Sequence, residues 1–250
     1  MLSLLLLCAM PGLFAKGVRA QPPSSAEILE AALDADAKNL ARARQRVATL
    51  ESARFINEHM PAAPSFKDHF ALLDHSIASV SSDVSSGLWA EFGVYRGVTI
   101  NHIASRAQGT IHGFDSWEGL PEDWRPGYPK GTFRMEGIPE VGPNVQLYRG
   151  WFSESLPGWA ESHPGHMAFI HFDADLYSST KDVLDVIGDR IVAGTVLQFD
   201  EFLNYPGWQH GEYKAFMEWV DASGVEFEFI GYVEGGNSEQ VAVRITAVAH

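Results

Sequence analysis

The chain of 250 residues contains almost no cysteine and comparatively few basic residues. Its single cysteine, Cys8, excludes an internal disulfide framework and any zinc site built from cysteines. Acidic residues outnumber basic ones, with 32 Asp and Glu against 18 Lys and Arg, for a formal charge of −14. Such a surface repels phosphate backbones and anionic lipid, and no Lys/Arg run interleaved with aromatics offsets it. The sequence therefore predicts neither a nucleic acid nor a membrane as partner.

Long hydrophobic runs are missing as well. The most apolar segment, Leu2 to Ala15, is too short to span a bilayer. The small residues of Val18-Arg19-Ala20 fit a cleaved export signal, yet no Lys or Arg precedes the apolar run. Residues 1–20 are thus interpreted as an apolar leader, with a packed N-terminal helix and a misplaced start codon as the alternatives to a signal.

What the chain does contain is the balance of a globular protein, 46% hydrophobic and 20% charged residues, enough for one α/β domain with extensions. Residues 25–86 predict a helical extension. Its first part has apolar residues spaced seven apart, namely Leu33, Leu40 and Val47, which predicts a helix packing on the body or on a second copy in a homodimer. Apolar positions from Phe66 to Val80 predict a second amphipathic helix.

From residue 87 to residue 250 the pattern changes to short apolar strands alternating with helices, which is typical of a parallel sheet covered on both faces. The predicted strands are Leu88–Gly93, Thr110–Phe114, Val145–Tyr148, Met167–Phe172 and Thr195–Phe199. The predicted helices are Val98–Arg106, Ser179–Ile191 and Glu212–Ala222. Two final strands, Glu226–Val233 and Gln240–Ile245, are joined by a hairpin-type link. The fold class is therefore α/β and Rossmann-like, a mostly parallel seven-stranded sheet ending in an antiparallel hairpin.

A glycine-rich turn follows the first of these strands, in the segment Glu91–Gly97. Glycines let the backbone approach a nucleotide, and free amides at the start of the next helix sit at its mouth. Glu91, two residues before Gly93, suits a cationic ligand such as a sulfonium with an α-ammonium group. The second strand ends at Asp115, which can accept both hydroxyls of a ribose or, alternatively, cap a turn. Together the two carboxylates predict a nucleoside site.

Four more carboxylates follow the fourth and fifth strands, Asp173 and Asp175 after one and Asp200 and Glu201 after the other. Crowded carboxylates raise one another's pKa values, and neither motif contains a Lys or Arg. A divalent cation is the economical neutraliser, and oxygen ligands favour Mg²⁺, with Mn²⁺ or Ca²⁺ as substitutes. The alternative is that one or two of these acids are helix N-caps.

The chain from about Leu88 to Tyr213 resembles the macrocin O-methyltransferase-like (TylF-like) family of class I S-adenosylmethionine-dependent methyltransferases. Five ordered motifs support this resemblance: Glu91–Gly97, Gly113–Pro121, Arg149–Pro157, His171–Thr180 and Asp200–Phe202. The resemblance implies a transferase with the Rossmann-like methyltransferase fold. It also implies an O-methyltransferase activity on a small-molecule hydroxyl of the sugar or natural-product type.

The resemblance further assigns roles to individual residues. The S-adenosylmethionine-binding set would be Glu91, Gly93, Tyr95 and Asp115, with the turn at Gly150, Trp151 and Phe152 flanking the adenine. The magnesium ligands would be Asp173, Asp200 and Glu201. Asp175 would be the general base that takes the proton of the acceptor hydroxyl. The family usually has Asp-Asp where this chain has Asp200-Glu201, which makes metal dependence less secure than the fold.

Two other functions fit parts of the pattern. The Asp173-Ala174-Asp175 motif suits a metal-dependent glycosyltransferase, although that class does not require Glu91 or the later acidic pair. A nucleoside-binding module without catalysis is the other alternative. His210 is interpreted either as a solvated loop residue or as a substitute base. Because S-adenosylmethionine is a cytosolic metabolite, the resemblance favours a cytoplasmic location over export.

Overall fold

The computed structural model describes residues 24, 30–31, 34, 37–107 and 109–248. The predicted leader, residues 1–20, and Leu33 lie outside the described residues. The chain divides into two compact units, Met1–Ala43 and Arg44–His250, and the second unit contains the whole sheet. Among the described residues, no helix is both long and apolar enough to cross a bilayer.

The sheet has eight strands in the order β1-β7-β8-β6-β5-β2-β3-β4. Their bounds are β1 Ser65–Phe66, β2 Leu88–Phe92, β3 Ile111–Asp115, β4 Val145–Arg149, β5 Met167–Phe172, β6 Ile191–Phe199, β7 Glu226–Val233 and β8 Val241–Ala247. Strand β8 runs antiparallel to β6 and β7, and the other pairs are parallel. The predicted mostly parallel sheet with a C-terminal hairpin is confirmed. The two-residue β1 is an eighth strand that lies just before, and partly within, the predicted second helix.

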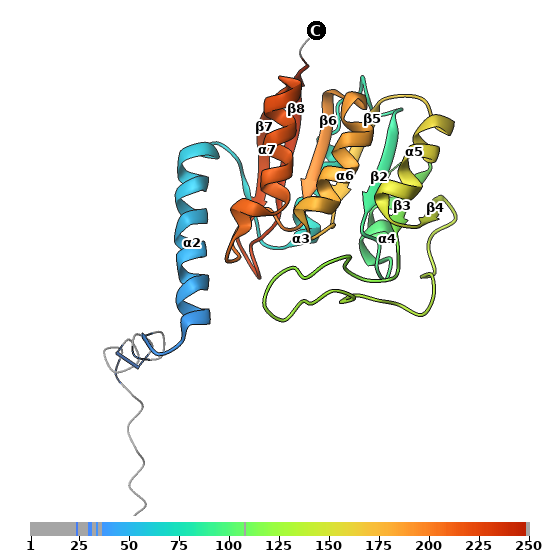
Figure 1. Cartoon of the computed structure of the whole chain (residues 1–250). Coiled ribbons are helices and arrows are strands. Elements are labelled where there is room, and N and C mark those ends of the chain that lie inside the picture. The colour runs from blue at the N-terminus through green and yellow to red at the C-terminus, as the bar shows by residue number, and fades with distance from the viewer. Residues whose placement is uncertain (1–23, 25–29, 32–33, 35–36, 108, 249–250) are drawn as a thin grey trace, which may run out of the picture. The chain divides into compact units, whose positions relative to one another are not determined.

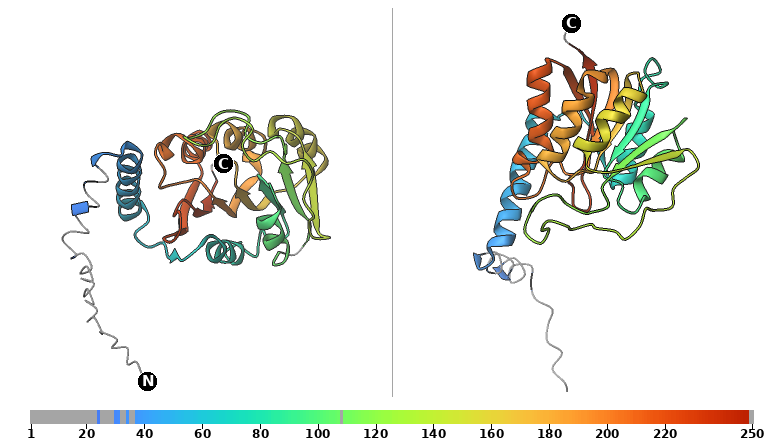
Figure 2. Two further views of the ribbon diagram at one scale, coloured as in Figure 1. Left: turned by 90° about the horizontal axis from the view of Figure 1, so that it is seen from below. Right: turned by 45° about the vertical axis from the view of Figure 1, so that its right-hand side comes forward.

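Helices α3 and α4 lie on one face of this sheet and α5, α6 and α7 on the other (Figure 1; Figure 2, left). The helices of the described residues are α2 Leu40–His59, α3 His69–Ala78, α4 Val98–Ala104, α5 Phe152–Ser162, α6 Tyr177–Ile187 and α7 Glu212–Ser223, with short 3₁₀ turns η1 Gly188–Arg190 and η2 Trp208–His210. Helix α5 was not predicted, because Pro157 and Gly158 both argue against a helix. Burial of Leu156 and Trp159 outweighs that local preference.

A row of four phenylalanines sets the register at the carboxyl ends of the central strands. Phe114, Phe92, Phe172 and Phe199 are fully buried and stack across β3, β2, β5 and β6, with neighbouring ring centroids 5.0, 5.8 and 4.9 Å apart. They are also paired partners in the sheet. The residues that follow them in the chain therefore end in one line along the edge of the sheet.

Helix α2 packs on the sheet unit through a different face from the predicted one. Its buried residues are Ala48 and Ser52, and the Ser52 hydroxyl accepts the Asn204 backbone N–H at 2.9 Å. Leu40 and Val47, the two described residues of the predicted apolar stripe, are 82% and 53% exposed. Neither side chain is buried, and the role of the stripe in a homodimer stays a prediction.

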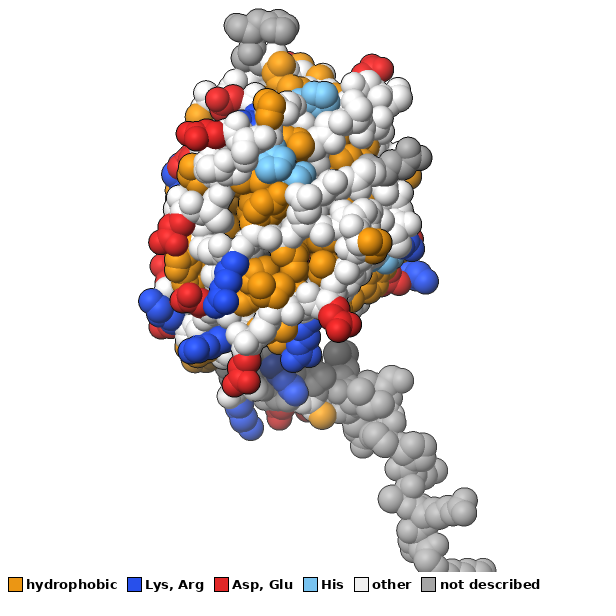
Figure 3. Space-filling model, turned by 90° about the vertical axis from the view of Figure 1, so that its right-hand side faces the viewer, with side chains coloured by type: hydrophobic (Ala, Val, Ile, Leu, Met, Phe, Trp, Pro, Cys, Tyr) orange, Lys and Arg blue, Asp and Glu red, His pale blue; other side chains and the backbone are white. Residues whose placement is uncertain are grey.

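Strand β4 forms one edge of the sheet. The face that carries this edge shows hydrophobic and histidine side chains between scattered charges (Figure 3). The apolar side chains of Val145 and Leu147 are only partly buried there. By contrast, the central strand β5 is buried along its whole length, and its neighbour β6 is buried from Thr195 to Phe199.

Candidate functional site

A cavity of about 540 Å³ lies at the carboxyl ends of the central strands. Its walls come from the turns after β2, β3, β5 and β6 and from the start of α5. The long connection between β3 and β4, drawn in green, crosses these strand ends (Figure 1; Figure 2, right). Several residues of that connection, including Trp124, Tyr128 and Phe133, line the cavity. This is the crevice where open α/β sheets bind ligands.

The glycine turn after β2 is shaped by a close approach to the neighbouring strand end. Gly93 has φ +94°, and a Cβ at this position would collide with the backbone carbonyl of Asp173. The Gly93 N–H donates to Phe114 O at 2.9 Å, and the Asp173 N–H donates to Phe92 O at 2.9 Å. Only glycine combines this φ with this approach, so the turn brings bare backbone to the cavity wall.

Asp115 pins the same turn. Its Oδ2 accepts the backbone N–H groups of Val94 and Tyr95 at 3.0 and 2.7 Å, and its Oδ1 accepts that of Trp117 at 2.6 Å. A carboxylate offers about four lone-pair sites, so one remains for a ligand. Asp115 lines the cavity, as predicted for a ribose-binding residue, but it also holds the shape of the glycine turn.

The predicted adenine-flanking turn lies on the cavity wall as well. Gly150 has φ +141° and donates its N–H to Asp115 O at 3.1 Å, which ties this turn to the end of β3. Trp151 is the N-cap residue of α5, and Phe152 is its first residue. Gly150, Trp151, Phe152 and Tyr95 all line the cavity, so the structure brings together most of the predicted nucleoside-binding set.

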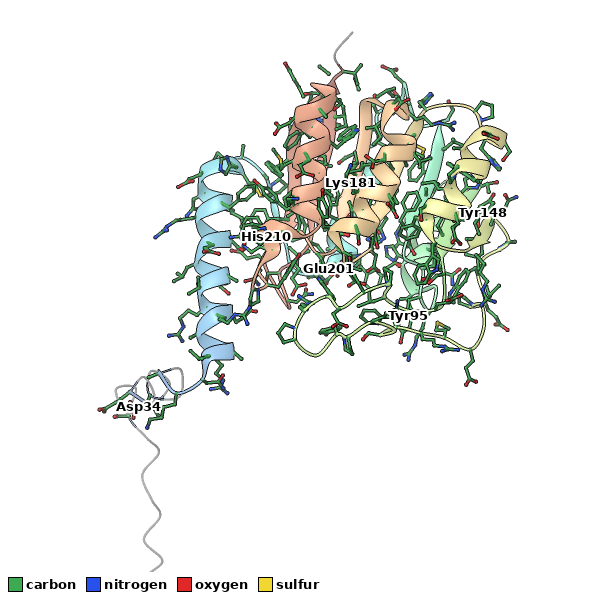
Figure 4. All side chains as sticks on the ribbon, viewed as in Figure 1. Asp34, Tyr95, Tyr148, Lys181, Glu201 and His210 are labelled. Atoms are coloured by element: carbon green, nitrogen blue, oxygen red, sulfur yellow. The ribbon has the colours of Figure 1, made fainter. Side chains whose placement is uncertain are left out.

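The acidic cluster occupies the other end of the cavity. Asp173, Asp175 and Glu201 line it, and Asp173, Asp200 and Glu201 each offer an oxygen within 4.8 Å of the others. Glu201 lies at the strand ends above the β3–β4 connection, at the same edge as Tyr95 (Figure 4). Asp175 has a backbone φ of +61°, an uncommon conformation for a non-glycine residue. Backbone strain of this kind concentrates at functional sites.

Burial dominates the electrostatics of this cluster. It raises the pKa values of Asp173 and Glu201 well above their usual range, and neighbouring carboxylates add to the effect. Burial raises the pKa of Asp175 to about 7, with Arg125 acting in the opposite direction. Glu201 Oε2 and Asp200 Oδ1 are buried without a hydrogen-bond partner among the described residues. The oxygen atoms therefore form a set that is incomplete by itself, and a hard dication fits it.

Glu212 holds the backbone of the acidic cluster in place, and the sequence analysis did not identify it. This fully buried carboxylate begins α7 and accepts the backbone N–H groups of Ala174 and Glu201 at 3.2 and 3.1 Å. It thereby holds the turn after β5 against the turn after β6. The only sequence signal was an acidic residue in the first turn of a helix, which is common.

Arg125 comes from the β3–β4 connection and was also missed. Among the described residues that line the cavity, it is the only Lys or Arg. Its guanidinium pairs with Glu239 at 3.0 Å and lies 3.9 Å from the ring centre of Trp124 and 4.9 Å from that of Tyr205. This contact fastens the connection to the loop between β7 and β8, so the aromatic residues beside it are held over the acidic cluster.

Three predicted or weighed residues lie outside the cavity wall. Glu91 is fully buried, accepts the Thr99 hydroxyl at 3.0 Å and pairs with His171 Nδ1 at 3.0 Å. Asp200 is mostly buried and faces His69 and His171 as well as the acidic cluster. His210 is exposed and is the last residue of η2, on the side of α2 (Figure 4). Direct contact of Glu91 with a cofactor stays a prediction.

Comparison with solved structures identifies the fold. The calicheamicin methyltransferase CalS11 superposes with a TM-score of 0.53 and 21% identity, covering 81% of this chain and 91% of that one. The O-methyltransferase NovP superposes with a TM-score of 0.51 and 20% identity, covering 71% and 80%. The chain therefore has the Rossmann-like methyltransferase fold.

Sequence comparison adds a family and a curated relative for part of the chain. A curated relative is the 8-demethyl-8-(2,3-dimethoxy-α-L-rhamnosyl)-tetracenomycin-C 4′-O-methyltransferase of Streptomyces olivaceus, 27% identical over 159 residues. The match covers 52% of this chain and 58% of the relative, little more than half of its length. Residues 130–226 match the model of the macrocin-O-methyltransferase (TylF) family. This segment contains three of the five motifs, Arg149–Pro157, His171–Thr180 and Asp200–Phe202, so the resemblance to the TylF family is confirmed over this part of the chain.

Proposed function

We propose that this protein is an S-adenosylmethionine-dependent O-methyltransferase that acts on a hydroxyl of a sugar or sugar-bearing natural product. The observation that supports it best is a single cavity with two unlike ends. One end consists of backbone turns at Gly93 and Gly150 beside Asp115, which suit a nucleoside. The other end consists of the buried carboxylates Asp173, Asp175 and Glu201, which suit proton removal next to a dication.

In this proposal Asp115 and the Gly93 turn hold the ribose and methionine parts, and Trp151 and Phe152 flank the adenine. Asp173, Asp200 and Glu201 would hold Mg²⁺ or a similar ion, which would supply positive charge that favours deprotonation of the acceptor hydroxyl. Asp175 takes the proton of the acceptor oxygen. That oxygen forms a bond to the methyl carbon as the carbon–sulfur bond of the sulfonium breaks, and orientation within the cavity supplies much of the acceleration.

The cavity walls and the relative both support this acceptor class. The S. olivaceus enzyme is named for the 4′-hydroxyl of a rhamnosyl group. In this chain Trp124, Tyr128 and Phe133 present flat apolar surfaces beside the acidic end, and Glu122 adds a carboxylate. Aromatic faces with nearby hydrogen-bonding groups suit a deoxysugar, because its ring has both apolar and hydroxyl-bearing sides.

Two measurements test this function. Calorimetry with S-adenosylhomocysteine should show a single site per chain, and Asp115→Asn should weaken it because the ligand-facing lone pair and the turn both change. Transfer of labelled methyl groups to an aryl α-L-rhamnoside should exceed transfer to a catechol. Binding of a nucleotide sugar in place of S-adenosylhomocysteine would support the glycosyltransferase alternative instead. Binding without transfer to any hydroxylated acceptor would support a non-catalytic module.

A further inference from the structure

A second group of metal-ligating side chains lies beside the acidic cluster and includes Asp200. His69 is the first residue of α3, His171 lies on β5, and Asp200 follows β6. Each offers one ligand atom, and these atoms lie within 4.8 Å of one another. Asp200 Oδ1 is 3.2 Å from His69 Nδ1 and 3.6 Å from His171 Nε2. Two imidazoles and one carboxylate therefore converge on one point.

These short separations are not hydrogen bonds. His171 Nε2 and Asp200 Oδ1 are both buried and have no hydrogen-bond partner among the described residues. An imidazole nitrogen directs its proton or its lone pair along the same line in the ring plane. His69 Nδ1 is 3.2 Å from Asp200 Oδ1, which has no hydrogen-bond partner in the described part of the chain, so this nitrogen is aimed beside the oxygen. His171 Nε2, at 3.6 Å, is too far from the same oxygen for a hydrogen bond. Unpartnered buried polar atoms are rare in folded proteins, so the arrangement indicates a ligand between the three groups.

His171 is oriented as a metal ligand would be. Its side chain is fully buried, and Nδ1 pairs with Glu91 Oε2 at 3.0 Å. A carboxylate can only accept a hydrogen bond, so Nδ1 donates to Glu91 and Nε2 is the nitrogen left to face a metal. Metal-bound histidines almost always donate their other nitrogen to a carboxylate or carbonyl in this way. Glu91 in turn accepts the Thr99 hydroxyl, which fixes its position.

We propose that His69, His171 and Asp200 form a binding site for a transition-metal dication of the Zn²⁺ type. In a tetrahedral zinc site with bonds of about 2.0–2.2 Å, neighbouring ligand atoms are about 3.3–3.6 Å apart. The two observed separations, 3.2 and 3.6 Å, match that edge. Imidazole nitrogen suits Zn²⁺, Co²⁺ or Ni²⁺, whereas oxygen ligands suit Mg²⁺. The site is thus chemically different from the all-oxygen set of Asp173, Asp200 and Glu201.

Asp200 belongs to both groups, so its carboxylate would be shared between the two ions. The second ion would join helix α3 to strands β5 and β6, since His69 lies on α3, whereas His171 lies on β5 and Asp200 follows β6. Asp68 already caps α3 by accepting the Ala71 N–H at 2.9 Å, so His69 stands on a formed helix end. Zn²⁺ should therefore raise the melting temperature of the metal-free protein by binding the folded state.

The test uses the full chain without a histidine tag, stripped of metal and dialysed against Zn²⁺ with Mg²⁺ in excess. Bound zinc is measured by atomic emission, and visible absorption of Co²⁺ bound in its place reports the type of ligands.

Wild-type protein should bind Zn²⁺, and His69→Asn should bind it at least 100-fold more weakly and lose the rise in melting temperature. His102→Asn, which removes a histidine paired with Asp74 at 2.7 Å on the surface, is the matched control and should bind as wild type. Glu201→Gln should keep the zinc, because its side chain belongs to the oxygen set.

Equal zinc affinity and equal Co²⁺ spectra in wild-type, His69→Asn and His102→Asn proteins would overturn the site. His171 would then be an imidazolium between Glu91 and Asp200. Circular dichroism in EDTA checks that His69→Asn is folded, and His69→Asp, which restores an oxygen ligand, should recover part of the affinity. No methyl transfer is needed for these measurements, so their failure leaves the proposed function untouched.

Discussion

The two ends of the cavity are built in opposite ways. At the β2–β3 end, the Asp115 carboxylate accepts three backbone N–H groups, and the Gly93 turn is hydrogen-bonded to the neighbouring strand. At the β5–β6 end, Glu201 and Asp200 carry buried oxygens without partners, and burial raises the pKa values of Asp173, Asp175 and Glu201. At the β2–β3 end the Asp115 carboxylate already has hydrogen-bond partners in the folded protein. At the β5–β6 end the buried carboxylates need a bound cation or protons to offset their charge.

In the proposed function, this difference separates cofactor binding from proton removal. A preformed backbone site should take up its nucleoside without help, because its groups are already in position and little ordering remains. The carboxylate end should govern the rate, because its charge state depends on what it binds. Four experiments can break or sharpen this contrast.

Removal of the metal should have the largest effect. Chelation with EDTA is expected to abolish methyl transfer while S-adenosylhomocysteine affinity stays the same, since the two ends use different strands. The Asp200→Asn variant should be active only at a higher Mg²⁺ concentration than wild type, because it has lost one anionic ligand. Rate measurements over a Mg²⁺ titration and calorimetry on the same samples give both readings. Full activity in EDTA with a harmless Asp200→Asn would show that the carboxylate end works without a metal.

Asp175→Asn should lower kcat by about 10²- to 10⁴-fold, the usual worth of a general base. The amide cannot accept the proton, but it preserves the shape of the side chain and leaves the metal ligands in place. Initial rates at saturating Mg²⁺ measure the loss, and equilibrium dialysis measures the retained metal. A rate within threefold of wild type, which is under about 0.7 kcal/mol in the barrier, would exclude Asp175 as the base.

Glu212→Gln should weaken metal binding by about 10- to 100-fold, the usual cost of losing an outer-shell partner. The Gln amide nitrogen would face a backbone N–H at Ala174 or Glu201, so the two acidic turns would separate slightly. Titration calorimetry with Mg²⁺ or Mn²⁺ measures the change. Exposed Glu218→Gln on the same helix is the control and should bind metal as wild type.

The smallest expected effect is on stability against pH. The folded-state pKa values of Asp175 and Glu212 are raised to about 7 and about 8, so the folded protein holds these protons more tightly than the unfolded chain. Metal-free protein should therefore lose stability as pH rises from about 4 to about 8. The melting temperature should fall by several degrees, since 1 kcal/mol moves it by about 2–4 °C in a domain of this size.

Added Mg²⁺ should flatten this pH dependence by replacing the protons, and Glu201→Gln should reduce it by removing one of the coupled carboxyls. Scanning calorimetry of wild-type and Glu201→Gln proteins at pH 5 and pH 8, with EDTA and with Mg²⁺, gives the comparison. Identical curves for the two proteins in EDTA would mean that the carboxylate end is compensated by groups already present, such as Arg125.

The positions of the residues at the β2–β3 end of the cavity could be predicted from the sequence, and those at the β5–β6 end only in part; their roles stay predictions. The strand ends predicted from the sequence also give the positions of Gly93, Asp115 and the Gly150 turn, because these residues end or directly follow strands. Asp173 and Glu201 were found in the same way. Helix α5 was missed because its Pro157 and Gly158 disfavour a helix locally, whereas the buried Leu156 and Trp159 stabilise it through the core.

The sequence by itself determined which residues end each parallel strand, because hydrophobic periodicity and turn residues are local properties of the chain. The row of buried phenylalanines then brings those ends into one line. Only the tertiary structure decided which distant groups meet them. Glu212 accepts a hydrogen bond from Ala174, 38 residues earlier in the chain, and Arg125 donates to Glu239, 114 residues later. His69, which precedes the central parallel strands in the sequence, contacts Asp200 at the end of β6. Such contacts depend on how helices and loops pack over the finished sheet, and no local pattern records that packing.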